Sequence, residues 1–427
     1  MNVARPRSSR RDRLVAAVIS TGCCWLPAIA HAQQLRPVVD VTASAGASSN
    51  PFLLEDAGDA AVFIEGAVAP RLTVSDERGN STIGGYVRGT AYLNGGYDPT
   101  WAIGAFAQSQ RSVSERLVIR GSVQLDSSII GERFNDALLN PPSFAVDPVP
   151  TQPTDVPTPG LQAPAPLVPQ IVAPDITLLG IRQRQTSIGG SVGASYQLST
   201  RDSLSADVQA QRSDNGGQLA SFSSYGASIG YSRSLSELTQ IGLRLNGQWT
   251  DFGDGFGGGT GEVYQPQITL DTRLSPLWRL SAGAGLLITE TKTPFTRTSA
   301  TGVSATARLC RDGERSEACL FGSRDAGPNG LGFISRRLNF GGSYSARLSA
   351  DDSLRAAVDY SRVDGDGALG VAENFSFFSA TAGYDRRLNQ RLRGGANAGF
   401  RRSDGSFGSG SDFSASLFIS ARLGSLQ

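Results

Sequence analysis

Two glycine motifs in the chain resemble sites of enzyme chemistry. Residues 189–193 read Gly-Gly-Ser-Val-Gly and match G-x-S-x-G, in which a serine on a sharp turn attacks a carbonyl carbon. Gly253, Gly255 and Gly258 match G-x-G-x-x-G, in which glycines let the backbone approach a pyrophosphate. The first motif lies inside an alternating strand pattern, and a strand rather than a helix follows the second. We therefore expect neither a serine nucleophile nor a dinucleotide site.

The single histidine of the 427-residue chain, His31, lies in a segment with the features of a secretory signal peptide. Residues 5–13 contain five arginines, and residues 14–30 are uncharged and mostly apolar. Ala30, His31 and Ala32 then form an A-x-A cleavage site. We expect this N-terminal segment, residues 1–32, to be removed on export.

The exported product, residues 33–427, then contains no histidine. This excludes mechanisms that need a histidine base, a histidine zinc ligand or a haem histidine. Losing five arginines and one aspartate changes the formal net charge from +1 to −3, which makes nucleic acid an unfavourable partner. The sequence therefore predicts no enzyme, no catalytic residue, no metal site and no cofactor.

Two cysteines, Cys310 and Cys319, remain in the exported chain. An even number of cysteines in an oxidising compartment indicates one disulfide, and two free thiols are the alternative. The residues between them are polar. We expect the bridge to close a small surface loop within a long outer connection, residues 289–333.

The exported chain alternates apolar and polar residues over repeated stretches of about 10 to 13 residues. From Ile188 to Leu198 the even-numbered residues are apolar or glycine, and the odd-numbered ones are Ser, Gly and Gln. Strands of this length cross an outer membrane at a tilt, whereas soluble strands average about five or six residues. We predict an all-β protein, a transmembrane antiparallel up-and-down β-barrel of about 16 strands, within a range of about 14 to 18. Five strands are expected at about 37–47, 60–74, 81–94, 99–110 and 116–126, and eleven follow.

Short turns framed by leucine alternate with longer connections rich in Gly, Ser and Asp. Leu198 and Leu204 frame one short turn, and Leu348 and Leu354 frame another. Outer-membrane barrels have short periplasmic turns and long outer loops, so the two kinds of connection assign the two ends of the barrel. The long connections are expected at 212–222, 251–262, 289–333, 363–374 and 401–411.

Residues 127–184 interrupt the series of strands. The stretch 141–174 holds 11 of the 21 prolines, and proline supplies no donor to a strand ladder. We interpret 127–184 as a Pro-rich long loop. It either remains outside the barrel or folds into the lumen as a constriction.

One face of nearly every strand carries charge, which argues for a water-filled lumen, because so many charges are too costly in a dry core. A barrel of about 16 strands leaves an aqueous channel. A lumen plugged by pairs of these charges is the alternative. Arginine is concentrated near the short turns, which favours anions at that end of the predicted barrel. The expected lumen-lining residues are Arg120, Asp207, Arg244, Asp271, Arg273, Arg347, Arg355, Asp359, Asp385, Arg387, Arg393 and Arg422.

The mature N-terminus, Pro37 to Phe52, resembles the first strand and loop of the β-barrel porin-2 type proteins of Gram-negative bacteria. Signal peptide, long alternating strands and short Leu-framed turns together resemble outer-membrane β-barrels. Some barrels of the porin-2 type accompany exopolysaccharide gene clusters. The chain departs from the usual assembly signal, because its last strand ends at Leu423 without a terminal aromatic residue.

These features predict a passive outer-membrane channel for small polar solutes, and two other functions remain open. The barrel could export a secreted polysaccharide, or it could be a non-conducting structural or adhesive barrel whose loops bind a partner. Outer-membrane lipid and the barrel assembly machinery are the expected partners, with polysaccharide or small polar solutes as cargo. The chain could also form an oligomer.

Overall fold

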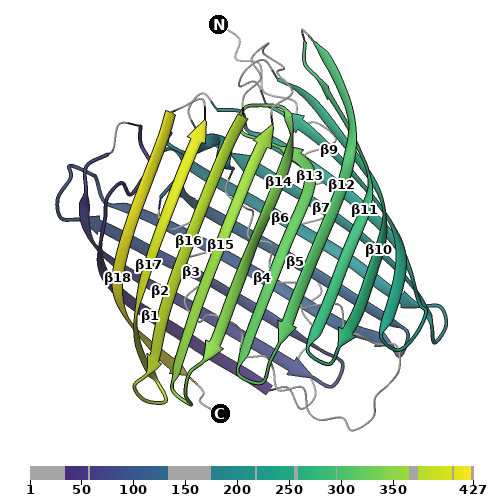
Figure 1. Ribbon diagram of the computed structural model, residues 1–427, viewed down its shortest axis with the longest axis horizontal. Coiled ribbons are helices and arrows are strands. Elements are labelled where there is room, and N and C mark those ends of the chain that lie inside the picture. The colour runs from purple at the N-terminus through teal and green to yellow at the C-terminus, as the bar shows by residue number, and fades with distance from the viewer. Residues whose placement is uncertain are drawn as a thin grey trace, which may run out of the picture.

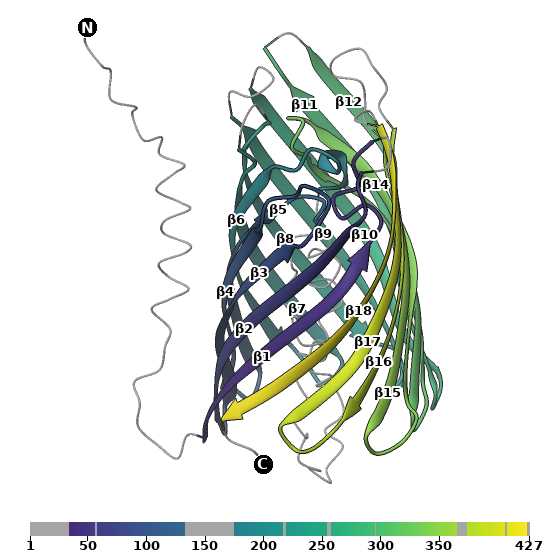
Figure 2. The ribbon, with the colours of Figure 1, turned by 90° about the vertical axis from the view of Figure 1, so that its left-hand side faces the viewer.

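The computed structural model describes residues 34–55, 58–132, 175–216, 219–253, 258–294, 296–364, 374–405 and 408–424. These residues form one closed antiparallel barrel of 18 strands, in which each strand pairs with its neighbours in sequence and β1 pairs with β18 (Figures 1 and 2). The strands are β1 (Gln34–Ser48), β2 (Ala61–Asp76), β3 (Gly79–Tyr92), β4 (Thr100–Ser114), β5 (Leu117–Ile129), β6 (Arg184–Gln197), β7 (Asp202–Asp214), β8 (Phe222–Ser234), β9 (Thr239–Phe252), β10 (Gly259–Ser275), β11 (Trp278–Lys292), β12 (Arg297–Asp312), β13 (Ser316–Pro328), β14 (Ile334–Arg347), β15 (Asp352–Asp364), β16 (Asn374–Arg387), β17 (Leu392–Gly405) and β18 (Gly408–Gly424).

A single-turn 3₁₀ helix, η1 (Ile176–Leu178), precedes β6. Within the described ranges, no helix is long and apolar enough to span a membrane. β1 begins and β18 ends at the end of the barrel where the connections are short, the lower end in Figure 2. We call the two ends the short-turn end and the long-loop end.

Alternation along each strand separates the two faces of the barrel wall. In β18 the odd-numbered Phe413, Leu417 and Ile419 are exposed, whereas the even-numbered Ser414 and Ser416 are buried. Leu417 is 69% exposed, which would be unfavourable in water but is favourable against lipid. Large exposed hydrophobic side chains occur on every strand, Tyr384 on β16 and Phe400 on β17 among them, so the outer face forms an apolar band.

One inward-facing pair shows how small residues shape the inner face. Tyr86 of β3 lies over Gly104 of β4 and donates a hydrogen bond to Asp126 of β5. A Cβ atom at position 104 would lie 2.1 Å from Cε1 of the tyrosine ring, so only glycine lets the ring cross β4. The long side chain thereby ties three strands together inside the barrel.

The expected long outer connection at 289–333 is wrong, and it accounts for the difference between about 16 and 18 strands. β12 and β13 lie inside this range, leaving connections at 293–296 and 329–333. Residues 303–309 do alternate, but Gly322 and Arg324 occupy outward positions of β13 and weaken its pattern. β13 pairs with β12 only as far as Arg324 and Ala305, so the upper part of β12 pairs with β11 alone (Figure 1).

Other predicted boundaries are nearer to those of the structure. β17 and β18 continue to Gly405 and from Gly408, so the expected connection 401–411 is much shorter. The other connections lie within a few residues of their expected places. Of the expected Pro-rich loop 127–184, residues 127–132 and 175–184 are described, and the proline-dense stretch lies outside the described residues. The expected signal peptide, residues 1–32, lies outside them as well.

Candidate functional site

An apolar cluster at the long-loop end joins parts of the barrel that lie far apart around the ring. Its buried members come from the end of β5, η1, the β7–β8 and β13–β14 connections, and the ends of β15 and β16. β5 and β15 lie nearly opposite each other among the 18 strands, so a cluster that joins them must cross the lumen. We call this set the mouth cluster; it contains Ile130, Leu178, Leu219, Leu331, Phe333, Val363 and Phe375, with Ile176, Leu179 and Ile181 packed against it.

Polar contacts of Asp175 position η1 within the mouth cluster. Its carboxylate accepts hydrogen bonds from the backbone N–H and hydroxyl of Thr177, as an N-cap, and from the backbone N–H of Gly330. The carbonyl oxygen of Gly330 accepts from the N–H of Ala220 at 2.8 Å. Burial raises the pKa of Asp175, and these hydrogen bonds oppose that effect. Three separate connections are thereby held together across the lumen.

Residues 130–132, directly after β5, anchor a second edge of this packing. Ile130 belongs to the mouth cluster, and the carbonyl oxygen of Gly131 accepts from Arg401 at 3.3 Å. The side chain of Glu132 is fully buried and accepts hydrogen bonds from the hydroxyls of Thr100 and Tyr92. Three consecutive residues therefore make an apolar, a backbone and a carboxyl contact inside the barrel.

Glu132 is a buried carboxyl group with incomplete pairing. Its second oxygen, Oε2, has no hydrogen-bond partner within the described part of the chain. Burial raises the pKa of Glu132 to about 7, although the two hydroxyls and the charge of Arg88 oppose the shift and Glu65 adds to it. The group therefore changes its charge near neutral pH.

A buried ion pair between Arg401 of β17 and Asp412 of β18 holds the β1–β2 connection. The two side chains lie 2.8 Å apart and are 3% and 0% exposed. Asp412 also accepts from the hydroxyl of Ser48 at 2.6 Å and the N–H of Asn50 at 3.0 Å. Arg401 donates to the carbonyl oxygen of Pro51 at 3.2 Å. Each charge is thus satisfied by several partners, as burial of a charge requires.

The same β1–β2 connection supplies an aromatic contact at the mouth. Phe52 is fully buried, and its ring centre lies 5.6 Å from that of Tyr92 and 5.2 Å from that of Tyr97. The guanidinium of Arg182, which follows η1, lies 4.5 Å from the Phe52 ring centre. This contact ties the β1–β2 and β3–β4 connections to the segment that leads into β6.

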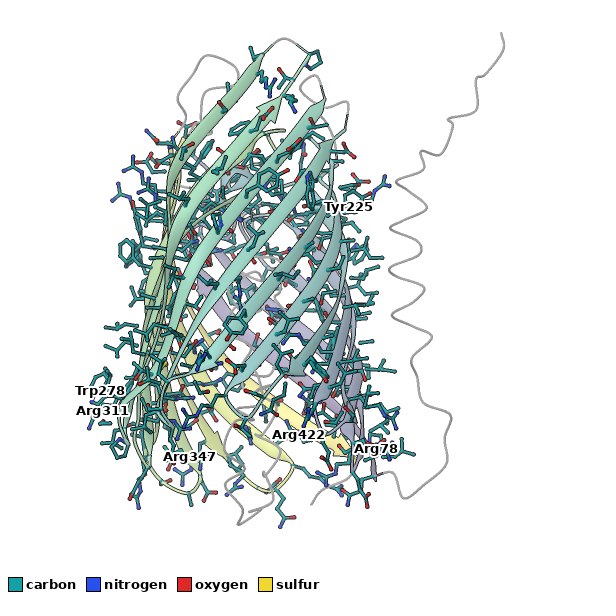
Figure 3. All side chains as sticks on the ribbon, turned by 90° about the vertical axis from the view of Figure 1, so that its right-hand side faces the viewer. Arg78, Tyr225, Trp278, Arg311, Arg347 and Arg422 are labelled. Atoms are coloured by element: carbon teal, nitrogen blue, oxygen red, sulfur yellow. A yellow bond between two sulfur atoms is a disulfide. The ribbon has the colours of Figure 1, made fainter. Side chains whose placement is uncertain are left out.

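The twelve residues expected to line the lumen all lie on the strand face opposite the exposed apolar residues. Arg120 and Asp207 pair at 2.5 Å, and Arg355 and Asp385 pair at 2.9 Å. Arg422 pairs with Asp40 at 2.9 Å. Arg387 reaches Asp351 in a short turn at 2.9 Å, and Asp271 accepts from Ser281 at 2.5 Å. Figure 3 shows Arg347 and Arg422 near the short-turn end.

The remaining predicted arginines are less constrained. Arg244, Arg273, Arg347 and Arg393 have no ion pair among the residues that the structure describes. Arg393 lies directly opposite Arg387 in the β16–β17 register, so two positive side chains are neighbours on the inner face. Asp359, the last of the twelve, lies in the same register layer as Ser379 on β16. Six of the twelve therefore belong to the ion pairs described above, and four arginines have no acidic partner among the described residues. Asp271 and Asp359 are the remaining two.

Sequence reasoning missed several charged residues of the interior. Arg88 and Glu65 pair at 3.0 Å with both side chains mostly buried, and the alternation of β2 and β3 could have indicated them. Asp40 could have been found in the same way. Arg401 lies in the expected connection 401–411 and Asp412 directly follows it, although the alternation of β17 and β18 continues through both residues. Glu132 and Asp175 flank the Pro-rich stretch, where no periodic signal is present.

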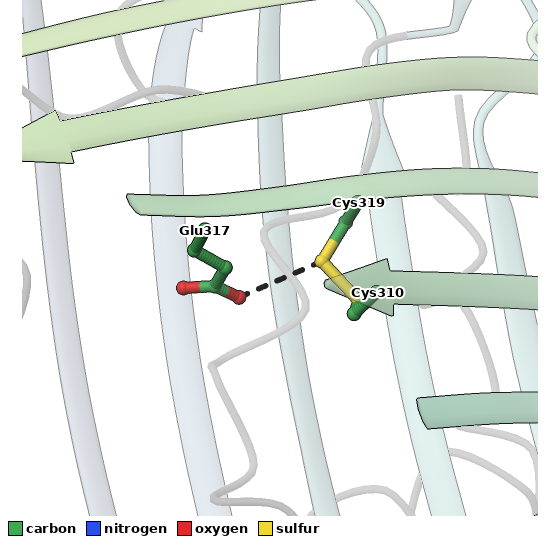
Figure 4. A group of neighbouring side chains, drawn as sticks. All are labelled: Cys310, Glu317 and Cys319. Carbon is green, nitrogen blue, oxygen red and sulfur yellow. Dashed lines mark hydrogen bonds between the residues drawn. A yellow bond between two sulfur atoms is a disulfide. The ribbon is translucent and has the colours of Figure 1, made fainter. Parts of the chain in front are cut away.

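Cys310 and Cys319 lie directly opposite each other on β12 and β13, with their sulfur atoms 2.10 Å apart (Figure 4). This is a disulfide distance. The pair is buried on the inner face, close to the short-turn end, so the expected position in an outer loop is wrong. Glu317 lies within 4.8 Å of both sulfur atoms. Two sulfur atoms at bonding distance do not offer two thiolate ligands, so this group does not support a metal site.

A closed antiparallel barrel needs no strand edge to be satisfied by water, and its apolar outer band fits a hydrocarbon layer. This chain has both features, and the start of β1 and the end of β18 both lie at the short-turn end. The chain has the architecture of a Gram-negative outer-membrane β-barrel, and the outer membrane is its location.

No family model and no curated protein sequence matches this chain. Among solved structures, it is similar to Pseudomonas aeruginosa OccK2 (OpdF) in complex with glucuronate, at 12% identity and a TM-score of 0.45, covering 92% of this chain and 99% of that chain. It is also similar to Pseudomonas aeruginosa OpdQ, at 9% identity and a TM-score of 0.45, covering 92% and 98%. A BenF-like porin from Pseudomonas fluorescens Pf-5 gives 9% identity and a TM-score of 0.44, covering 92% and 99%. At these values no solute or residue role is transferred to this chain.

Proposed function

We propose that this barrel is a passive channel for small polar solutes, with a preference for anions. The observation that carries the proposal is the closed ring of 18 strands with charge on its inner face. Rings of about 16 to 18 strands enclose an aqueous channel, whereas about eight strands leave room only for side chains. Arg347 and Arg393, which have no acidic partner in the described ranges, would be too costly to bury without water.

The mouth cluster supports a limit on solute size. Apolar side chains from opposite walls meet at the long-loop end, and the Arg401–Asp412 pair fixes a further connection beside them. These contacts narrow the cross-section that the 18 strands would otherwise leave open. Solutes would therefore pass beside the packed connections, and small molecules would be favoured over polymers.

Charge supports the preference for anions. The twelve inner-face residues comprise eight arginines and four aspartates. Arg120, Arg355 and Arg422 have acidic partners on the inner face, whereas Arg244, Arg273, Arg347 and Arg393 have none among the described residues. Unpaired guanidinium groups along a water-filled wall attract anions and are well suited to carboxylates.

Conductance of the refolded barrel in a planar bilayer tests this proposal. We expect discrete channels, and in a salt gradient a reversal potential of the sign for anion preference. A barrel that inserts but never conducts would refute the channel and favour the structural or adhesive alternative. Among the described contacts, none favours polysaccharide export. Polysaccharide export would be supported instead if the barrel did not conduct and deletion of its gene removed exopolysaccharide from the medium.

We also propose that the Cys310–Cys319 disulfide forms in the exported protein. The sulfur atoms are at bonding distance, and the compartment is oxidising. Intact mass before and after reduction and alkylation tests it. Alkylation of both cysteines without prior reduction would contradict the bond.

A further inference from the structure

Four of the short turns share one backbone geometry. In each, a leucine N–H donates to the carbonyl oxygen four residues later, at 2.9 Å. A serine or asparagine side chain then caps the N–H groups inside the turn. The four donor–acceptor pairs are Leu198 and Asp202, Leu235 and Thr239, Leu348 and Asp352, and Leu388 and Leu392.

Two of these turns carry the same additional group of side chains. At the first, the hydroxyl of Tyr231 donates to Asp202 at 2.6 Å, and Nε of Arg233 lies 3.9 Å from the same oxygen. At the second, Tyr384 donates to Asp352 at 2.5 Å, and Nε of Arg386 lies 3.7 Å away. We call each Asp–Tyr–Arg group a rim triad. β7 and β15, which carry the aspartates, lie on nearly opposite sides of the ring.

The rim triads are not needed to form the turn. The β8–β9 turn has the same backbone hydrogen bonds with Thr239 at the aspartate position, and the β16–β17 turn has them with Leu392. A carboxylate, a phenol and a guanidinium that recur together twice, on a turn that forms equally well without them, indicate a separate role.

The triads project outward at the short-turn end. Tyr231 follows the exposed Ile229 on the outer face of β8, and the turn leucines Leu198 and Leu348 are about half exposed. The side chains of Arg233 and Arg386 are 56% and 62% exposed. Apolar residues therefore hold the aspartate–arginine pair at the boundary between the lipid band and water, where phospholipid headgroups lie.

We propose that each rim triad binds the phosphoethanolamine headgroup of a membrane phospholipid. The guanidinium donates to the phosphate, and the aspartate accepts from the primary ammonium. Tyrosine and the turn serine hold the carboxylate, since Ser199 and Ser349 each donate to it at 2.6 Å. Each triad has one negative and one positive charge, which matches a zwitterionic headgroup. Phosphatidylglycerol has no cation for the aspartate, and phosphatidylcholine has no N–H to donate.

Lipid retention by the full chain, purified in detergent and measured by native mass spectrometry, tests the assignment. The probes are phosphatidylethanolamine, phosphatidylglycerol and phosphatidylcholine with matched acyl chains. We expect up to two molecules of phosphatidylethanolamine to be retained in preference to the others. The double variant R233Q/R386Q should bind it on the order of tenfold more weakly. D202N/D352N should retain lipid phosphate but lose the preference over phosphatidylglycerol.

Controls separate headgroup recognition from folding. R78Q removes an arginine from the same end of the barrel, outside any triad, and should leave lipid retention unchanged (Figure 3). R233K/R386K should be intermediate, and each variant must keep the heat-dependent gel mobility of a folded barrel. Equal retention of the three lipids, or wild-type retention by R233Q/R386Q, would overturn the proposal. If equimolar soluble phosphoethanolamine displaced the lipid, the site would be assigned to a free phosphoester, and the proposal of a membrane lipid would be overturned.

Discussion

At the long-loop end, connections from several parts of the chain are buried against each other. At the short-turn end, neighbouring strands are joined by a few exposed residues. The Arg401–Asp412 pair at the former is 3% and 0% exposed, whereas the Arg387–Asp351 pair at the latter is 49% and 52% exposed. The same wall therefore ends in buried, packed connections at the long-loop end and in exposed turns at the short-turn end. Under the proposed function, solute size would be selected at the first end and charge at the second.

Among the variants considered, removal of Arg401 should loosen the packed connections at the long-loop end most strongly. R401A leaves Asp412 buried without its partner, and losing one member of a buried pair costs about 3–5 kcal/mol. We expect loosened connections, larger single-channel conductance and a lower unfolding midpoint in urea. The matched control is R422A, whose partner Asp40 lies near the short-turn end. Equal effects of the two variants would contradict a special role of the long-loop end.

Shortening Leu178 should have the next largest effect. L178A removes a fully buried side chain from the mouth cluster, which costs about 2–5 kcal/mol and leaves a cavity. Larger sugars should then enter proteoliposomes in a swelling assay. L243A, on the lipid-facing side, is the control and should leave the size limit unchanged. An unaltered limit in L178A would mean that the cluster does not restrict passage.

Protonation of Glu132 should change how tightly the connections pack at the long-loop end. Its folded-state pKa is about 7 against an ordinary value of 4.5, so the folded state retains a proton that the unfolded state loses between these pH values. The contribution of Glu132 to stability is therefore fully present below about pH 4.5 and is lost as pH rises to about 7, a change of up to about 3 kcal/mol. We expect conductance to rise from pH 5 to pH 8.

The glutamine variant E132Q should abolish this pH dependence, because it stays neutral with a similar shape. E115Q changes an exposed carboxyl in the β4–β5 turn and should leave it intact. Persistence of the wild-type profile in E132Q would assign the titration to another group.

The smallest expected effect concerns charge selection at the short-turn end. R347Q/R393Q removes two arginines without acidic partners in the described ranges, and should reduce the anion-to-cation permeability ratio by about twofold at low salt. Conductance and stability should hardly change. R201Q, in an exposed turn at the same end, is the control, and an unchanged reversal potential in R347Q/R393Q would exclude these side chains from selectivity.

The barrel and its inner face follow from a period of two, which depends on neighbouring residues only. That is why the strand around Ile188 and the inward position of Arg355 could be predicted. β13 was missed because Gly322 and Arg324 stand at outward positions. The sequence indicated only, as one of two alternatives, that the segment 127–184 folds into the lumen. It could not indicate which residues pack against Leu178, since these come from distant strands. Contacts of that kind leave no local period in the sequence.

The crossing of Tyr86 over Gly104 has a consequence for how such barrels diverge. The ring occupies the space that any Cβ at position 104 would need, so a larger residue there requires a smaller one at position 86. Through the lost hydrogen bond, that exchange would also release selection on Asp126. Among descendants of this chain, the three positions should therefore be inherited as a unit or replaced together.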